Sequence, residues 1–556
     1  MLTLQIKGGG TMKKKAFLIS ISVLVISVAL ICVMYLFTCP KNPDLNTAIT
    51  THGNTDWHID TAEEFLTGKD MNGTITAVNH CPDNWTRRHI HIGLSNTNHF
   101  YYDKDITTSG DDTNPTNGID QAMLFFYAGH GWPESWDTLG NSATQQYMSL
   151  GNCPGGGLLR YYWQCSCEVF AHGPKNCPGE TFDYSWPGNF DGSADSPNMR
   201  NVYERWGPVL DPDLRMAGGA STPAYCHEQQ INRIWDNYNN NSFDVADSFI
   251  DGLNWWGVVP LCITIGGSDV TSTPLYDATF TNQPNTSGTS HYHIQYLSNF
   301  ASTPREPELI IHIPELLPIL RVFKLPFPEP LRDVEFNIMD NWMVSPDEVG
   351  DRGPRVRVHL LSGAVYIIGE RKLTVGEPIL KEEEYIERAL GFIEEQGWTE
   401  RNFTEAMGKK FMIEKMPVEG KVDDIQKFQK NIIVTFKRQI EVDGFLVNVL
   451  GEGGVMRVQM NNDGSLLNAS KVWREVVVIE RKLPVKTYNE AYEEALKQIE
   501  TPQAYKLDRW TWGYKEAAGN VEQTELKIVF QFAFVPIDPE TSMKYPPQMI
   551  EILGQE

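Results

Sequence analysis

Positive charge is scarce in this 556-residue chain. It contains 47 lysines and arginines against 71 aspartates and glutamates, which gives a formal net charge of -24 at pH 7. Nucleic acids and anionic membrane surfaces attract basic proteins, so this balance argues against both as partners. The apolar content of 41% is ordinary for a globular protein and argues against a disordered chain.

Cysteine is missing from the second half of the chain. All nine cysteines lie at or before Cys262, and the second half also lacks a histidine cluster. Charge is distributed in the opposite way, because 44 of the first 300 residues are charged but 74 of the remaining 256. This asymmetry predicts two differently built domains, residues 40–303 and 335–556, joined by a proline-rich linker at 304–334. It places no catalysis in the second domain.

An uncharged run near the amino terminus predicts a membrane anchor. Residues 16–37 are 22 residues without a charge, and three lysines at 13–15 precede them. At about 1.5 Å per residue, such a helix is long enough to cross a bilayer. By the positive-inside rule, residues 1–15 are cytoplasmic, residues 16–38 form a single-pass transmembrane helix, and the bulk of the chain is extracytoplasmic.

Alternatives for this segment stay open. One is a cleaved signal peptide, although its apolar core usually runs only ~7 to 15 residues. Another is a lipid anchor at Cys39, for which the preceding Thr38 is a poor match. Met12 is an alternative start, since the codons for residues 7–10 can spell a ribosome-binding sequence, which indicates a prokaryotic source.

Two short apolar runs are typical of strands buried on both faces of a parallel sheet. Residues 122–131 end in His-Gly, and residues 158–167 end in Cys. Ligands of open α/β sheets lie outside the carboxyl ends of the strands, so adjacent strands would bring His130 and Cys167 to one cleft. An imidazole beside a thiol favours a thiolate nucleophile near neutral pH. Buried strands alternating with helical patterns predict a doubly wound, mostly parallel α/β sheet.

The order and spacing of these motifs resemble the caspase and gingipain-like cysteine peptidases (clan CD). Within them, the chain looks most similar to an uncharacterised prokaryotic family of caspase-like proteins. The resemblance implies a caspase-like fold, with His130 as general acid/base and Cys167 as nucleophile. It also implies an oxyanion hole formed by the backbone N–H groups of Gly131 and Cys167.

Cys165 is the alternative nucleophile. The family pattern places an acidic or small residue after the cysteine, and Glu168 after Cys167 fits it better than the sequence around Cys165. The chain departs from the family at the next two positions, where Val169 and Phe170 replace the usual Ser/Thr-Gly. This departure bears on the geometry of the turn that holds the nucleophile.

Two neighbouring segments would shape a substrate cleft. A loop with Trp132 and Trp136 follows His130, and its aromatic side chains either bind substrate or pack on the core. The resemblance implies that the strand after the nucleophile lines the specificity pocket. Asp211, Asp213 and Arg215 are the candidates there, and the sequence does not choose among them.

Seven cysteines remain beyond the predicted membrane edge. An oxidising exterior favours three disulfides and one free thiol, and a free thiol in that setting is a candidate for reactivity. The seven are Cys81, Cys153, Cys165, Cys167, Cys177, Cys226 and Cys262.

Residues 335–556 are predicted to be α+β. Residues 382–396 and 488–499 have similar helical apolar stripes, which predicts a helix-plus-sheet unit duplicated about 106 residues apart. The strands and glycine-rich turns of residues 431–466 resemble PepSY-like domains of exported proteins. That resemblance implies a small module that inhibits or chaperones an attached protease.

Metal binding is the remaining pattern. His89 and His91, and likewise His291 and His293, have the spacing of two ligands on one strand face. No nearby Cys or acidic pattern completes either pair, and the acidic loop at 191–195 lacks the EF-hand pattern. The sequence therefore predicts no metal and no other cofactor.

Together these patterns predict a membrane-anchored, extracytoplasmic cysteine peptidase that acts on protein or peptide substrates through His130 and Cys167. The alternative is a non-catalytic surface module that keeps the fold for binding or assembly. A metal-binding surface protein would require the two histidine pairs to converge. The substrate, the disulfide pairing and the oligomeric state do not follow from the sequence.

Overall fold

The structure is a computed structural model of the chain. The expected anchor at 16–38 lies outside the described residues, and within them no helix is long and apolar enough to cross a membrane. The described residues are 47–52, 56–69, 79–83, 85–89, 100–103, 106–112, 118–129, 131–132, 135–138, 141–150, 159–166, 169–170, 202–210, 214–221, 227–254, 258–273, 275, 280, 288–299, 313–323, 335–349, 353–372, 374–398, 403–420, 424–537 and 548–555.

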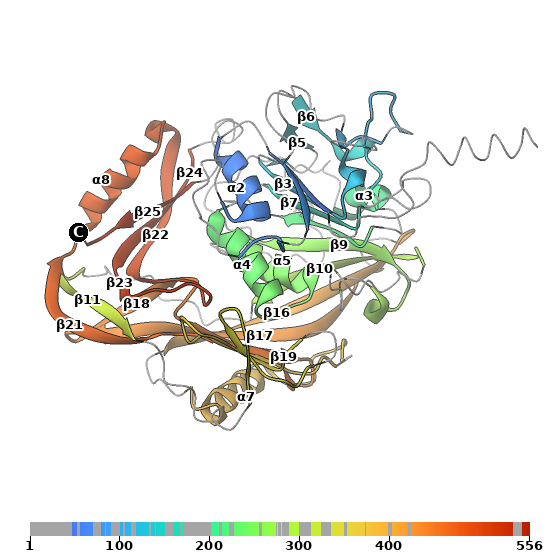
Figure 1. The fold of residues 1–556 in the computed structure, drawn as a ribbon. Helices are drawn as coiled ribbons and strands as arrows, with labels where there is room; N and C mark the ends of the chain where they lie inside the picture. Colours follow the sequence, from blue (N-terminus) through green and yellow to red (C-terminus); the bar gives the residue numbers. More distant parts are fainter. Residues whose placement is uncertain are drawn as a thin grey trace, which may run out of the picture.

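Parallel strands form the centre of the first half (Figure 1). β1 pairs in parallel with β2 on one side and β3 on the other, and β3 is followed by β7 and β8. β9 then pairs with β8 in the antiparallel direction. The predicted mixed α/β class is confirmed. The strands are β1 (Thr47–His52), β2 (Thr86–His89), β3 (Leu124–Ala128), β7 (Tyr161–Cys165), β8 (Met216–Ala220) and β9 (Pro260–Gly266).

Both faces of this part of the sheet are buried. Along β3, Leu124 and Phe126 belong to one core cluster and Phe125 and Tyr127 to the other, because successive side chains of a strand alternate between faces. The first cluster includes side chains of α2, α4 and α5, and the second includes those of α3. The apolar run around β3 is thus continuous because helices cover both faces. The helices are α2 (Asp56–Thr67), α3 (Val202–Trp206), α4 (Glu228–Asn239) and α5 (Val245–Leu253).

The sheet continues from the first half into the second. β9 pairs with β10, and all nine residues of β10 pair with β16 of the second half. β16 and β17 form a long antiparallel hairpin, from which the sheet extends through the strands of the second half. No break in strand pairing therefore marks the boundary expected near residue 300. The strands are β10 (His291–Asn299), β16 (Phe403–Pro417), β17 (Gln426–Val442), β19 (Val455–Asn461), β20 (Leu466–Val472), β15 (Val365–Ile368), β14 (Val356–His359), β13 (Trp342–Val344) and β12 (Asn337–Met339).

The proline-rich interval 304–334 is not only a linker. Residues 316–323 form β11, which pairs in the antiparallel direction with β21 (Glu475–Pro484) and β23 (Glu525–Leu526). Leu317 and Leu320 are buried in the core beneath this small sheet. Pro318 is tolerated because the strand register shifts between Pro318 and Leu320. The interval predicted as a proline-rich linker therefore contains a strand of this small sheet.

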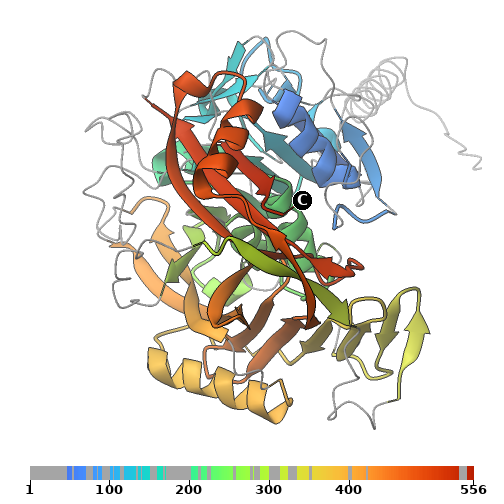
Figure 2. The same ribbon diagram turned by 90° about the vertical axis from the view of Figure 1, so that its left-hand side faces the viewer.

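The two predicted helices of the second half are confirmed as α7 (Glu382–Glu395) and α8 (Tyr488–Gln498). Their amino termini match at an offset of 106 residues, since Glu384 accepts from the N–H of Lys381 (2.7 Å) and Glu490 from that of Thr487 (2.8 Å). Figures 1 and 2 show α7 beneath β17 and β19, and α8 at the opposite end of the second half. The same offset relates their buried stripes, which are Tyr385, Ala389 and Ile393 in one and Ala491, Ala495 and Ile499 in the other.

α8 lies over a second group of antiparallel strands. β22 pairs with β24, and β24 with β25. β18 joins them to the first group, because it pairs with both β17 and β22. The strands are β18 (Phe445–Gly451), β22 (Tyr505–Glu516), β24 (Ile528–Pro536) and β25 (Gln548–Leu553).

Candidate active site

The carboxyl ends of β3 and β7 lie level with each other. The two strands pair in register from Leu124 and Tyr161 to Ala128 and Cys165. The pairing continues one step further, because the N–H of Gly129 donates to the carbonyl of Cys165 (3.1 Å). His130 and Cys167 each follow the last pair by two residues in the sequence, and both lie outside the described residues. The described structure therefore gives the platform of the predicted dyad, but not its side chains.

Two glycines flank His130. A Cβ atom on Gly129 would lie 2.1 Å from the hydroxyl oxygen of Tyr127, so the end of β3 has no room for a side chain. Gly131, whose N–H was predicted for the oxyanion hole, is buried and opens β4 (Gly131–Trp132). Only glycine therefore fits at the position that precedes His130 in the sequence.

A three-stranded antiparallel sheet follows His130, where a loop was expected. Trp136 pairs with Gly131 on one side and with Ala143 on the other. The strands have two to four residues each, too short for a periodic pattern to reveal them. They are β4, β5 (Ser135–Thr138) and β6 (Asn141–Ala143).

Hydrogen bonds hold the end of β7 just before Cys167. The Gln164 side chain donates from Nε2 to the hydroxyl of Tyr162, and its Oε1 accepts from the hydroxyl of Ser166 (3.2 Å). Gln164 and Ser166 are both fully buried. Burial raises the pKa of the Tyr162 hydroxyl well above its ordinary value, so this group stays neutral. The residue that precedes the predicted nucleophile is therefore fixed by its neighbours.

Val169 and Phe170, which follow Cys167 in the sequence, are also held by hydrogen bonds. The carbonyl of Val169 accepts from Arg205 Nη1 (2.8 Å) and from Trp206 Nε1 (3.0 Å), at the end of α3. The N–H of Phe170 donates to the carbonyl of Ala220 on β8 (3.1 Å), and its ring stacks on Trp206 with centroids 4.2 Å apart. Val169 and Phe170, the departure from the family pattern, thus tie this segment to α3 and β8.

Cys165, the alternative nucleophile, is fully buried and disulfide-bonded, and its partner lies outside the described residues. A sulfur in a disulfide is not a thiolate. Cys81 and Cys262 are free thiols. Burial raises the pKa of Cys81 to about 12 and that of Cys262 well above its ordinary value, so both stay protonated. With two free thiols described, the expected set of three disulfides and one free cysteine was wrong.

Arg215 does not lie at the predicted cleft. The main-chain N–H of Arg215 donates to the carbonyl of Arg160 (2.7 Å), and Arg215 directly precedes β8. This is the amino end of the parallel strands, whereas the cleft was predicted at their carboxyl ends. A five-residue strand separates the two edges by roughly 16 Å at ~3.3 Å per residue. The other two specificity candidates, Asp211 and Asp213, lie outside the described residues.

Of the four histidines considered as possible metal ligands, only His293 has a buried side chain among those described. His293 is fully buried on β10 with its Nε2 2.9 Å from the carbonyl of Gly267. Burial lowers its pKa to about 4, so it is neutral and donates this hydrogen bond from Nε2. Nδ1 of His291 lies 2.8 Å from the Ser290 hydroxyl. In the described part of the chain, no three His, Cys, Asp or Glu side chains converge on a possible metal position.

The sequence-based interpretation missed an acidic stripe on α5. Asp244, the N-cap, and Asp247 and Asp251 within the helix are all buried. Lys430 of β17 lies 2.7 Å from a carboxylate oxygen of Asp244 and 2.7 Å from one of Asp247. Arg233 of α4 lies 3.4 Å from Asp251. These buried acidic side chains hold α5 to its neighbours.

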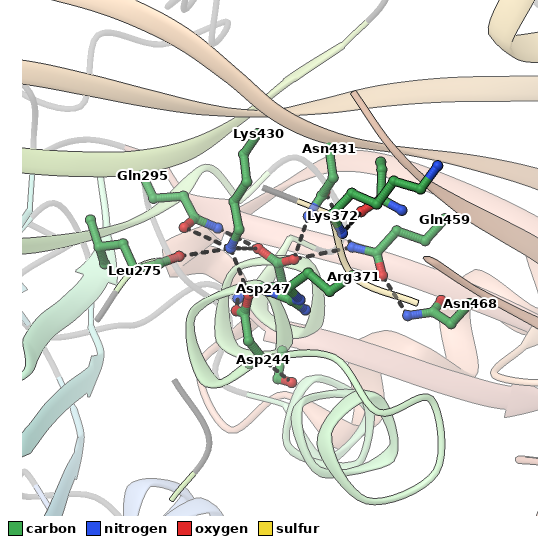
Figure 3. A network of polar contacts seen from close by, with 12 residues as sticks. Asp244, Asp247, Leu275, Gln295, Arg371, Lys372, Lys430, Asn431, Gln459 and Asn468 are labelled. Carbon is green, nitrogen blue, oxygen red and sulfur yellow. Dashed lines mark hydrogen bonds and ion pairs between the residues drawn. The ribbon is translucent and has the colours of Figure 1, made fainter. Parts of the chain in front are cut away.

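The network around Lys430 extends further into the second half (Figure 3). Arg371 donates to Asp244 (2.6 Å), while Asn431 and Gln459 donate to the second oxygen of Asp247 (2.9 and 3.1 Å). Burial raises the pKa of Asp247, and Asp244 adds to that rise. Against the effect of burial, Lys430 and Arg371 hold the pKa of Asp244 below its ordinary value. With Lys430, Asp244 and Asp247 at most 1% exposed, the network is an internal connection and not a substrate site.

Comparison with known proteins does not assign the chain to a family. No family model and no curated protein matches the chain. Among solved structures, an uncharacterized protein from Eubacterium rectale matches 43% of this chain and 83% of its own, with 8% identity and a TM-score of 0.24. A likeness at this level carries no argument about fold or function.

Proposed function

We propose that the chain is a membrane-anchored, extracytoplasmic cysteine peptidase with a caspase-like fold and a His130/Cys167 dyad. The observation that carries the proposal is the register of β3 and β7, whose last pair is Ala128 and Cys165. Adjacent strands lie about 4.8 Å apart, and each candidate residue follows this pair by two positions. Such an arrangement supports an imidazole and a thiol meeting at one edge of the sheet.

The order of the strands also supports a site at the carboxyl ends of the parallel strands. β1 has β2 on one side and β3 on the other, so the direction of the winding reverses there. In doubly wound sheets, ligands bind outside the carboxyl ends of the strands near such a reversal. The candidate site lies on β3, directly beside this position, and on β7, the next strand.

The proposed reaction needs no cofactor. The Cys167 thiolate attacks the scissile carbonyl carbon, and the N–H groups of Gly131 and Cys167 stabilise the oxyanion. His130 protonates the leaving amine as the C–N bond breaks, which leaves a thioester. His130 then takes a proton from water, whose oxygen attacks the thioester and releases the acid and the thiolate. The PepSY-like half would restrain this site or recruit substrate.

Peptide hydrolysis by the purified full-length chain in detergent tests the proposal. A mixture of quenched fluorescent peptides is incubated with the wild type, Cys167→Ala and His130→Ala. We expect hydrolysis by the wild type only. Cys262→Ala removes a buried thiol outside the site and serves as the matched control, which should keep activity. Hydrolysis that survives Cys167→Ala would rule out the proposed nucleophile.

The alternative of a non-catalytic binding module depends on the disulfide of Cys165. If Cys167 is its partner, no thiolate forms and the site is inert. Peptide mapping without reduction distinguishes the two proposals. The peptidase proposal predicts that Cys165 is joined to a cysteine other than Cys167, and that Cys167 is recovered as a thiol.

A further inference from the structure

We propose that Arg205 and Trp206 are positioning residues for the Cys167 nucleophile. Both donate a hydrogen bond to the carbonyl of Val169, two residues after Cys167. The inference rests on the proposed peptidase function and adds to it a device that holds the nucleophile's turn in place. Nothing in the sequence pattern of the dyad pointed to α3.

Two donors from one short helix meet at a single carbonyl oxygen. Arg205 is 2% exposed and Trp206 is fully buried. Burying a guanidinium group is costly unless its hydrogen bonds are made, and the bond to the Val169 carbonyl is one of those that Arg205 makes. The two N–H groups occupy both lone pairs of the Val169 oxygen, which fixes the orientation of this peptide group.

Phe170 fixes the next residue in a second direction. Its ring stacks on Trp206 with an interplanar angle of 13°, and its N–H donates to Ala220 of β8. A Cβ on Gly219 would lie 2.3 Å from the Phe170 ring, so the ring fits only because Gly219 has no side chain. α3 and β8 together therefore hold the segment that follows the nucleophile.

The anchors before and after Cys167 limit the positions that this residue can take. Ser166, one residue before it, is fixed by its hydrogen bond to Gln164, and Val169 is fixed two residues after it. Consecutive Cα atoms are about 3.8 Å apart, so Cys167 bridges two anchored points with one residue between it and the second. A loss of either anchor would widen the range of thiol positions relative to His130. A misplacement of about 1 Å is enough to slow a positioned reaction strongly.

The test is the alkylation rate of Cys167 by iodoacetamide in the full-length chain in detergent, measured by peptide mass. Trp206→Phe keeps the stacking on Phe170 but removes the N–H donor, and Arg205→Lys keeps the charge but changes the donor geometry. Trp235→Phe is the matched control, because Trp235 is a fully buried indole of α4 whose Nε1 has no hydrogen-bond partner among the described residues. Thermal unfolding establishes that each variant is folded at the assay temperature.

We expect Trp206→Phe and Arg205→Lys each to slow alkylation three- to tenfold, and Trp235→Phe to change it less than twofold. Combined with His130→Ala, Trp206→Phe should cause no further loss, because the thiol that Trp206 positions then has no imidazole to meet. Rates for Trp206→Phe equal to those for Trp235→Phe would overturn the positioning role alone. A wild-type rate that does not depend on His130 would overturn the proposed function, and the positioning role with it.

Discussion

Lys430 of β17 lies 2.7 Å from Asp247 of α5, and neither side chain is more than 1% exposed. This ion pair joins residues 183 positions apart and connects the two halves of the chain. Substitution of Lys430 by Met leaves Asp244 and Asp247 buried beside each other with one cation fewer. Removing one partner of a buried ion pair costs about 3–5 kcal/mol. We expect a loss of that size in the free energy of unfolding, measured by urea denaturation.

Lys372→Met is the control for this prediction. Lys372 lies 2.9 Å from Asp463, but these side chains are 48% and 29% exposed. Surface ion pairs contribute about 0–1 kcal/mol, so this variant should be close to the wild type. Equal losses in the two variants would show that the buried network does not join the halves as described.

The raised pKa of Glu452 leads us to predict that the free energy of unfolding depends on pH. Burial, and then repulsion from Asp236, raises the pKa of Glu452 from 4.5 to about 8. The folded protein therefore binds a proton that the unfolded chain has lost between about pH 4.5 and 8. Stability must fall as pH rises through this window, because protonation favours the folded state there. We expect a loss of about 2 kcal/mol between pH 5 and pH 8, less than the full shift implies because Glu452 keeps some contact with solvent.

Glu452→Gln tests the assignment of this pH dependence. The amide can keep a contact with Asn232, which donates to the Glu452 carboxylate, but it does not titrate. We expect the loss between pH 5 and pH 8 to fall to less than half. Glu441→Gln, at an exposed position on β17, should leave the pH profile of the wild type unchanged.

Gly129→Ala tests the packing beside His130. The new methyl group would meet the hydroxyl of Tyr127, whose side chain is fully buried. Overpacking of this kind costs about 1–3 kcal/mol. The matched change Gly391→Ala, in α7 where a Cβ meets nothing within 4 Å, should stabilise the chain by about 0.5–1 kcal/mol. Unfolding midpoints that shift in the same direction would contradict the packing described at Gly129.

The buried strands were predictable because burial on both faces leaves a direct trace in the sequence. Residues 122–131 and 158–167 are apolar runs of strand length, and they contain β3 and β7. The helices α7 and α8 were also predictable, because each shows its buried stripe at helical spacing. A local sequence pattern is enough to predict a helix or strand when that element packs its apolar side chains against the core.

What was missed depends on contacts between distant parts of the chain. In the sequence, nothing distinguishes the acidic residues of α5 from a solvated helix face, because Lys430, which lies against them, is far away in the chain. β11 is hidden in a proline-rich interval, because its partner β21 begins more than 150 residues later. Likewise, the main-chain carbonyl of Val169 is held by Arg205 and Trp206, whose positions in the sequence are 36 and 37 residues away. No local pattern encodes such partners.

Thiol reactivity tests the central claim most directly. The full-length chain is labelled with iodoacetamide over a range of pH, and the modified cysteines are located by peptide mass. We predict rapid labelling of Cys167, titrating below the ~8.5 of an ordinary thiol and lost in His130→Ala. The buried thiols Cys81 and Cys262 should react only after unfolding. A Cys167 that is disulfide-bonded, or that reacts equally well without His130, would contradict the proposed dyad.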